Sequence, residues 1–469
     1  MVKYAPLKKW LHKLHERIGD FWWYSLMLFC ACRAADLLNA FVGLWLVPKY
    51  VGPSELGAVM PLMSFSGFLA LPIGIFAMTF AKEMTTLATR GEYGKLKSLM
   101  RGVFIGASIF LILALATSRL ILPLFLERIR IAEGSLGVLI IATAFISTIA
   151  PVYQNALQAL KRFESISLIN IVSAPLRFIT MLIAMPFRAL SGYFIGQISQ
   201  PTFTILASIY ALRKELAVPA VPYWSQAVFR QFFVLLVSIA TYQMAGGFLG
   251  LIEQTVLRQR LPEIESAAYY MTTRFSDIAG FICGTLTMVL FPFTASLATN
   301  SKPTRPLVIK SSLAMLATGA LLALVFELAG EPLLSILPDG DKYASYAWAI
   351  PWLIGITSVS AIQTFHTNTE AAAGRFGFLK WWVPLHIVFA VTLLAITGYG
   401  YFSNYLPSTW LDFLATHNFT SLKAMLVWFT ATTLIRTGIS LFELMRQPAG
   451  TNGIPPDAAS SPVSPTLYH

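Results

Sequence analysis

Two arginine–aspartate couples interrupt apolar stretches of the chain. Arg33 and Asp36 lie in "FCACRAADLLNAF", and Arg274 and Asp277 lie in "MTTRFSDIAGF". Residues three apart share one face of a helix, so each couple is expected to form an ion pair on that face. An arginine guanidinium can also hold a phosphate or diphosphate through two parallel hydrogen bonds. The spacing therefore predicts either a structural pair within each helix or a site for an anionic group.

The apolar stretches are long enough to cross a bilayer. Of the 469 residues, 56% are hydrophobic and 12% are charged, and the mean hydropathy is +0.66. Soluble domains carry about 25% charged residues. A membrane-spanning helix needs about 20 apolar residues, and we predict an all-α integral membrane protein with about twelve such helices. The predicted helices begin near residues 22, 57, 102, 135, 166, 189, 228, 266, 307, 345, 378 and 421.

Charged side chains inside these predicted helices must be paired or face water, because each costs about 2.5 to 3.5 kcal/mol at the bilayer centre. The predicted helices contain five arginines: Arg33, Arg119, Arg177, Arg274 and Arg436. By helical rise, Arg33, Arg177 and Arg274 come near the middle of the membrane. We expect these three to converge on a central cavity and bind an anionic group. Asp36, Asn39 and Gly43 extend the polar face of the first helix, and Asp277 accompanies Arg274.

The distribution of Lys and Arg predicts the orientation. Basic residues are concentrated in the segments that are cytoplasmic if the N-terminus is inside, which is the usual bias in membrane proteins. We therefore expect a multi-pass protein of the cell's inner (plasma) membrane with both termini cytoplasmic. The net charge of +12 then reflects topology and attraction to anionic membrane lipid, and we expect no nucleic-acid partner.

An internal repeat divides the chain into two halves. "NALQALKRF" (155–163) and "NTEAAAGRF" (368–376) share an Asn, an Ala and an Arg-Phe pair at an offset of 213 residues. We predict two six-helix lobes, 21–215 and 216–445, related by an axis along the membrane normal. Residues 1–20 are basic and amphipathic, typical of a helix on the inner leaflet. Residues 446–469 are rich in Pro, Ser and Ala and are expected to be a disordered cytoplasmic tail.

Three further segments carry a family resemblance: "LVPKYVGPSELGAVMPLMSFSGFLALPIGIFAMTFAKEM", "QNALQALKRFESISLINI" and "AAYYMTTRFSDIAGFICGTLTMVLFPFTASLA". Over roughly residues 20–445 the chain resembles the polysaccharide-export (Wzx-type) branch of the MOP/MATE superfamily. The resemblance implies two six-helix lobes around a cavity that opens alternately to the two sides of the membrane. It also implies a cargo, a polyprenyl-diphosphate-linked oligosaccharide moved from the inner to the outer leaflet, and work alongside glycan polymerase machinery.

Two relatives on the same scaffold remain alternatives. Lipid II flippases carry cationic residues on the first, second and eighth helices, but here the predicted second helix, 57–81, has no charge. MATE-like multidrug exporters are ion-coupled. "GLIEQTVLRQRL" (250–261) resembles the family's seventh helix, with Glu253 at the position of an acidic residue. Glu253 or Asp36 is therefore expected either to take up H⁺ or Na⁺ or to form a structural ion pair, and no other cofactor is expected.

Other function classes fit less well. A site for cationic cargo would favour uncompensated acids, whereas arginines outnumber acids in the predicted helices. A glycan polymerase or ligase would need a long external loop with catalytic groups, and the connections are short. We expect no enzyme, no resident metal and a monomer. Cys30, Cys32 and Cys283 lie in predicted helices and are expected to be buried packing residues.

Overall fold

The computed structural model describes residues 20–131, 136–223, 226–299, 305–372, 377–397 and 421–446, and its long elements are all helices. They are α2 (Asp20–Phe41), α4 (Pro53–Thr89), α5 (Tyr93–Arg128), α6 (Leu136–Ala159), α7 (Phe163–Ala184), α8 (Ala189–Ala211), α10 (Gln226–Arg260), α11 (Glu263–Thr299), α12 (Arg305–Ser335), α13 (Ala349–Ala372), α14 (Leu379–Ile396) and α16 (Leu422–Arg446). Short elements are the π-helix η1 (Val42–Leu46), α3 (Val47–Tyr50), α9 (Arg213–Leu216) and the 3₁₀ turns η2 (Gly340–Lys342) and η3 (Ala344–Tyr346).

The long helices confirm the predicted order of apolar segments. Each begins within four residues of its predicted start except α5, which begins nine residues earlier because its first turns are the basic segment before the apolar run. The predictions for residues 1–19 and 447–469 lie outside the described residues.

Several helices meet the requirements of a membrane span. Within the described residues, seven are long and apolar enough to cross a bilayer: parts or all of α4, α5, α6, α7, α10, α12 and α16. The arginine–aspartate helices α2 and α11 are not among the seven. Large apolar side chains such as Leu120, Leu324 and Leu328 are exposed on the outer surface of the bundle, as expected where lipid replaces water. The chain is an all-α, multi-pass membrane protein.

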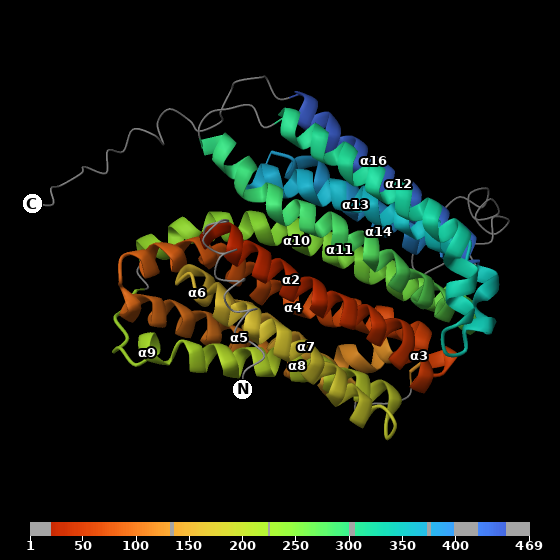
Figure 1. Cartoon of the computed structure of the whole chain (residues 1–469), viewed down its shortest axis with the longest axis horizontal. Helices are drawn as coiled ribbons and strands as arrows, with labels where there is room; N and C mark the ends of the chain where they lie inside the picture. Colours follow the sequence, from red (N-terminus) through yellow and green to blue (C-terminus); the bar gives the residue numbers. More distant parts are fainter. Residues whose placement is uncertain are drawn as a thin grey trace, which may run out of the picture.

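The helices pack in two similar groups, which Figure 1 shows as a lower bundle of α2 to α8 and an upper bundle of α10 to α16. We call these groups the N-lobe and the C-lobe. In the N-lobe α4 packs on α6, α6 on α8 and α2 on α7; in the C-lobe α11 packs on α13, α13 on α16 and α10 on α14. Helices α6 and α13 both have 24 residues, and their bounds differ by 213. The repeated packing agrees with the sequence repeat, while the domain boundary at 215/216 stays a prediction.

The two lobes meet along one seam, where α4 lies against α10 and α11 and α2 lies against α11. The largest core cluster crosses this seam, because Leu62 and Phe65 of α4 belong to the same buried set as Tyr270 and Phe275 of α11. The seam therefore brings α2 and α11, which carry the two arginine–aspartate couples, face to face.

The segment that joins the lobes is fastened to one end of the N-lobe. Lys97 Nζ donates to the carbonyl oxygen of Leu216 (2.6 Å), and the Tyr223 hydroxyl donates to Glu83 Oε1 (2.6 Å). Burial and this hydrogen bond to a carboxylate raise the pKa of Tyr223, so its hydroxyl stays a neutral donor. The connection thus leaves the N-lobe where α4 ends and α5 begins.

The cysteines are only partly as predicted. Cys283 is buried and Cys32 is half-buried, but Cys30 is exposed, so the prediction of burial is wrong for Cys30. Cys30 lies three residues before Arg33 and therefore shares the partly exposed face of α2 with that arginine. Among the described residues the cysteines are free thiols, and no cluster of His, Cys, Asp or Glu could hold a metal ion.

Candidate functional site

Both predicted ion pairs form at the seam. Arg33 Nη1 lies 2.9 Å from Asp36 Oδ2 on α2, and Arg274 Nη1 lies 3.0 Å from Asp277 Oδ2 on α11. The arginine side chains are 28% and 23% exposed, so neither pair is fully buried. An aspartate three residues away lies on the same helix face, which is why the pairing could be read from spacing alone.

Each of these arginines also reaches across the seam. Arg33 Nη1 donates to the carbonyl oxygen of Phe281 on α11 (2.8 Å), and Arg274 Nη2 donates to Met60 Sδ on α4 (2.7 Å). A thioether sulfur is a weak acceptor and a helix carbonyl is already engaged in its own helix. An anionic ligand would therefore be a stronger partner for both guanidinium groups than these protein atoms are.

The local packing fixes the position of Arg274. Its guanidinium lies over the ring of Tyr270, 4.9 Å from the ring centroid. On the opposite lobe, a Cβ added to Gly43 would come within 2.8 Å of Arg274 Cδ and 3.6 Å of the Tyr270 hydroxyl. Gly43 belongs to the π-helix η1, and such segments often occur at functional sites. The polar stripe predicted on α2 thus includes the glycine that makes room for Arg274.

Arg177 of α7 joins Arg274 from the N-lobe side. Its Nη1 donates to Asn39 Oδ1 (2.8 Å) and to Gln200 Oε1 (3.4 Å). Arg177 and Arg274 lie within electrostatic range of each other and of Tyr193 and Tyr270. The Nε–H group of each is buried without a hydrogen-bond partner. Buried donors are normally satisfied, so these two groups of like charge have hydrogen-bonding capacity that the described protein atoms do not use.

Arg33 lies at a different level of α2. It precedes Asn39 by six residues on α2, which at a helical rise of about 1.5 Å places it about 9 Å further along the axis. The structure brings Arg177 and Arg274 together and sets Arg33 at a second level of the same seam. Sequence spacing could locate the arginines on their helices, whereas nothing in the sequence pointed to Met60 as a partner.

The remaining candidates lie elsewhere. Arg436 of α16 donates to its own helix, at Thr432 O and Thr433 Oγ1 (both 3.2 Å), and sits inside the C-lobe. Glu253 of α10 lies within electrostatic range of Arg436, and its Oε1 is buried without a hydrogen-bond partner. The side chain of Arg119 lies outside the described residues. Glu253 is therefore a half-buried acid of the C-lobe whose described charged neighbour is Arg436.

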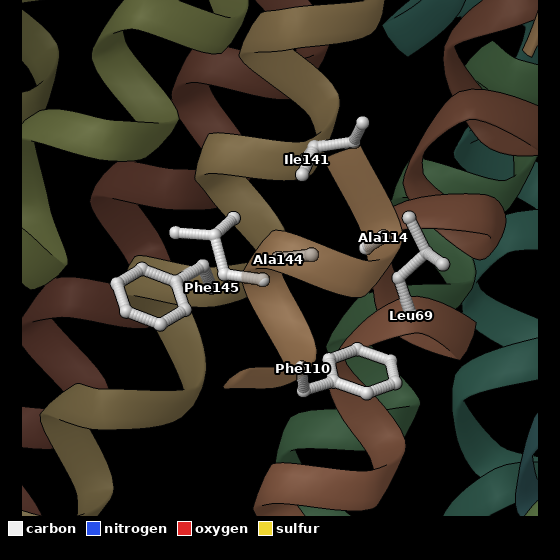
Figure 2. A pocket seen from close by; sticks show the side chains of 7 residues that line it. Leu69, Phe110, Ala114, Ile141, Ala144 and Phe145 are labelled. Atoms are coloured by element: carbon white, nitrogen blue, oxygen red, sulfur yellow. The ribbon is translucent and has the colours of Figure 1, made fainter. Parts of the chain in front are cut away.

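Two described cavities are apolar and do not coincide with the arginines. Figure 2 shows the smaller one, between α4, α5 and α6, where Leu69, Phe110 and Ile141 surround a space of about 10 Å³. That volume is about one water probe, and its lining offers no polar partner for a water. The other, of about 350 Å³, lies among α12, α13 and α16. Its Ser358 hydroxyl is already bonded within its own helix, to Ile354 O.

The fold is shared with solved membrane transporters. No protein-family model and no curated protein matches the chain. An inward-facing MATE-family multidrug transporter of the MOP superfamily aligns over 88% of this chain and 94% of its own, at 14% identity and a TM-score of 0.59. The Vibrio cholerae MATE transporter VcmN aligns over 95% and 98%, at 15% identity and a TM-score of 0.60.

A flippase structure is equally similar. The lipid II flippase MurJ, in an inward closed conformation, aligns over 90% of this chain and 87% of its own, at 15% identity and a TM-score of 0.59. The chain thus has the fold of the MOP-superfamily transporters. At these identities the likeness concerns the fold, and the cargo must be argued from the site.

Proposed function

We propose that this chain is an alternating-access flippase that moves a polyprenyl-diphosphate-linked oligosaccharide from the inner to the outer leaflet, for assembly of a cell-surface polysaccharide. The observation that carries the proposal is the pair of unused guanidinium donors on Arg177 and Arg274 at the lobe seam. A diphosphate offers several anionic acceptors in a small volume and could not otherwise cross hydrocarbon. A planar guanidinium matches it through bidentate hydrogen bonds.

Release of the cargo depends on the aspartates. Each charge-assisted hydrogen bond contributes about 1.5 to 3 kcal/mol, so two arginines without competition would hold a diphosphate tightly. Asp277 competes for Arg274, and Asp36 competes for Arg33 one level away. Arg177 donates to the neutral amide oxygen of Asn39, which an anionic phosphate oxygen can replace as acceptor. The aspartates therefore keep the arginines charged and ordered between cargoes and weaken cargo binding enough for release.

In this proposal, transport is driven by the uptake of H⁺ or Na⁺ at Glu253 or Asp36. Glu253 is half-buried, its Oε1 has no described hydrogen-bond partner, and the side chain lies within electrostatic range of Arg436. Binding of a proton or a metal ion would change the charge balance within the C-lobe and hence the preferred state. Asp36 stands at the seam, where its ion pair with Arg33 would change with the lobe arrangement.

The proposed setting follows the predicted topology. The protein lies in the inner membrane with both termini cytoplasmic, and its lobes are residues 21–215 and 216–445. It acts as a monomer and delivers its lipid-linked cargo to glycan polymerase machinery. The ends where α4 and α11 begin then face outwards.

Two alternatives use the same fold. A MATE-like exporter would carry amphipathic cations, which the clustered arginines disfavour because like charges repel. A lipid II flippase would share the diphosphate chemistry, but the predicted second helix, 57–81, lacks a charged residue. The two flippase proposals predict lipid intermediates that differ in the number and type of their sugars, so the intermediate that accumulates without the protein distinguishes them.

The test is the lipid that accumulates when the arginines are removed. In a strain that lacks the chromosomal copy, Arg274→Ala and Arg177→Ala should leave the protein inserted in the membrane while a polyprenyl-diphosphate-linked oligosaccharide accumulates, as measured by mass spectrometry. Arg101→Ala removes an exposed arginine of α5 and serves as the matched control. Normal export by the Arg177→Ala/Arg274→Ala double variant would leave the arginines a structural role only.

A further inference from the structure

One end of the seam carries a reciprocal exchange of hydrogen bonds between the lobes. Arg258, near the end of α10, donates from Nε to the carbonyl oxygen of Ile129 at the end of α5 (3.1 Å). Arg130, the next residue after Ile129, donates from Nη2 to the carbonyl oxygen of Gln259, the next residue after Arg258 (2.8 Å). Each lobe thus supplies one guanidinium and one carbonyl oxygen. We call these four residues, together with Ser54, the clasp.

Arg258 is the buried half of the clasp. It is 0% exposed, and its Nη2 also donates to the carbonyl oxygen of Ser54 in the first turn of α4 (2.5 Å). Its described hydrogen-bond partners are therefore backbone oxygens of the opposite lobe, and not a carboxylate of its own. A buried guanidinium that loses its partners without gaining water is strongly disfavoured. Separation of the lobes at this end must therefore either expose Arg258 to water or leave it unpaired.

The neighbouring helices approach closely at the same end. Ser266 of α11 donates from Oγ to the carbonyl oxygen of Gly57 on α4 (3.3 Å). A Cβ added at Gly57 would overlap with this Ser266 hydroxyl and come within 3.2 Å of Arg258 Nη1. The close contact between α4 and α11 is thus continuous with the clasp.

Arg130 occupies a backbone position that favours glycine. Its φ is +61°, in the left-handed region, and the hydrogen bond from Ile131 N to Leu126 O (2.9 Å) closes the end of α5 around it. Glycine is the usual residue at such a helix end because it has no Cβ. An arginine there adds backbone strain, while its side chain makes the bond to Gln259. Arg130 thus makes its bond to the other lobe from a backbone position that would suit glycine better.

We propose that the clasp is a latch that holds the lobes together at the ends where α4 and α11 begin, and that it opens whenever the cavity faces that side. The latch rests on the alternating-access part of the proposed function and is independent of its cargo. It sets the balance between the two states: the stronger the clasp, the smaller the fraction of molecules open at this end.

The distance between the lobes measures this balance directly. Spin labels on cysteines introduced at Glu127 of α5 and Arg260 of α10, both exposed, report the opening of the clasp end in the purified full-length protein. The three native cysteines are first replaced by serine. Pulsed electron paramagnetic resonance then gives the populations of short and long distances.

The variant Arg130→Gly removes the exposed half of the latch. Because glycine suits the positive φ, the end of α5 should still form in this variant. An exposed charge-assisted contact corresponds to about a two- to fivefold change in an equilibrium, so the ratio of long to short distances should rise by that factor. Arg258→Met, which removes the buried half, should raise the ratio tenfold or more.

Lys161→Gly is the matched control. Lys161 has φ +57° at the end of α6, with the equivalent hydrogen bond from Arg162 N to Leu157 O (2.9 Å), and its side chain is exposed. The substitution removes a cation and relaxes the same backbone strain without touching the clasp. It should leave the distance ratio unchanged.

The possible results separate the latch from the proposed function. Two distance populations whose ratio is the same in the parent protein, Arg130→Gly and Lys161→Gly would overturn the latch and leave alternating access standing. A single short distance in every variant, including Arg258→Met, would contradict both. If Arg258→Met does not fold, the comparison of Arg130→Gly with Lys161→Gly still tests whether the clasp is a latch.

Discussion

Replacement of Gly43 by alanine should displace Arg274 without disturbing the helices around it. The added Cβ would stand 2.8 Å from Arg274 Cδ, whereas ordinary contacts begin at 3.4 Å, so the arginine side chain must move by roughly 0.6 Å or more. Alanine is favoured over glycine in a helix interior by about 1 kcal/mol. The backbone of the segment that contains η1 therefore has no reason to change, and the crowding falls on Arg274.

The expected magnitude follows from the contacts that Arg274 can make. Loss of one charge-assisted hydrogen bond to a diphosphate costs about 1.5 to 3 kcal/mol, which corresponds to about 10- to 150-fold weaker cargo binding. Overpacking costs about 1 to 3 kcal/mol, and the helix preference offsets about 1 kcal/mol of this. The free energy of unfolding should therefore fall by no more than about 2 kcal/mol, so that binding is affected more than stability.

The assay is the binding of a polyprenyl diphosphate lipid to the purified protein, with thermal unfolding measured on the same samples. Gly67→Ala makes the same change on α4 at a position where nothing lies within 4 Å of the added Cβ, and it should bind as the unchanged protein does. If the Gly43→Ala protein binds the polyprenyl diphosphate with full affinity and has an unchanged melting temperature, the assignment of Arg274 to the cargo site is refuted.

Other substitutions test separate parts of the account. Asp277→Asn should bind the diphosphate lipid about tenfold more tightly and transport it more slowly, because Asp277 no longer competes with the lipid for Arg274. Equilibrium binding and initial export rates test this prediction, and weaker binding would contradict it. Glu253→Gln should abolish the dependence of transport on the H⁺ or Na⁺ gradient, and an unchanged gradient dependence in proteoliposomes would remove Glu253 from the coupling. Gly137→Ala should lower the free energy of unfolding by about 1 to 3 kcal/mol, because the new Cβ overlaps with Leu122; an unchanged unfolding midpoint in denaturant would count against this packing.

The periodic and compositional features of the sequence were sufficient to predict the helices and their duplication. Apolar run length placed the start of α8 at Ala189, and the repeat offset of 213 matches the bounds of both α6 and α13. The equal lengths of α4 and α11, 37 residues each, follow the same duplication. These features are local or repeated, and a single sequence shows them directly.

Contacts between helices distant in the chain could not be predicted in the same way. The ion pairs at i and i+3 were readable from spacing, but the bond from Arg177 to Asn39 depends on how α2 packs on α7. Arg258 is a further case, because its complete burial depends on how α10 packs against α4. Side-chain partners across a seam are set by helix packing, on which a single sequence gives no direct information.

The central claim is that the seam arginines bind an anionic lipid head group. Native mass spectrometry of the purified protein with a polyprenyl diphosphate, and with the uncharged polyprenol as a reference, tests it most directly. We expect the diphosphate to bind to the unchanged protein and to Arg101→Ala, and to bind at least tenfold more weakly to Arg177→Ala and Arg274→Ala. The uncharged polyprenol should bind equally to all of them. Equal diphosphate binding by all four proteins would contradict the claim.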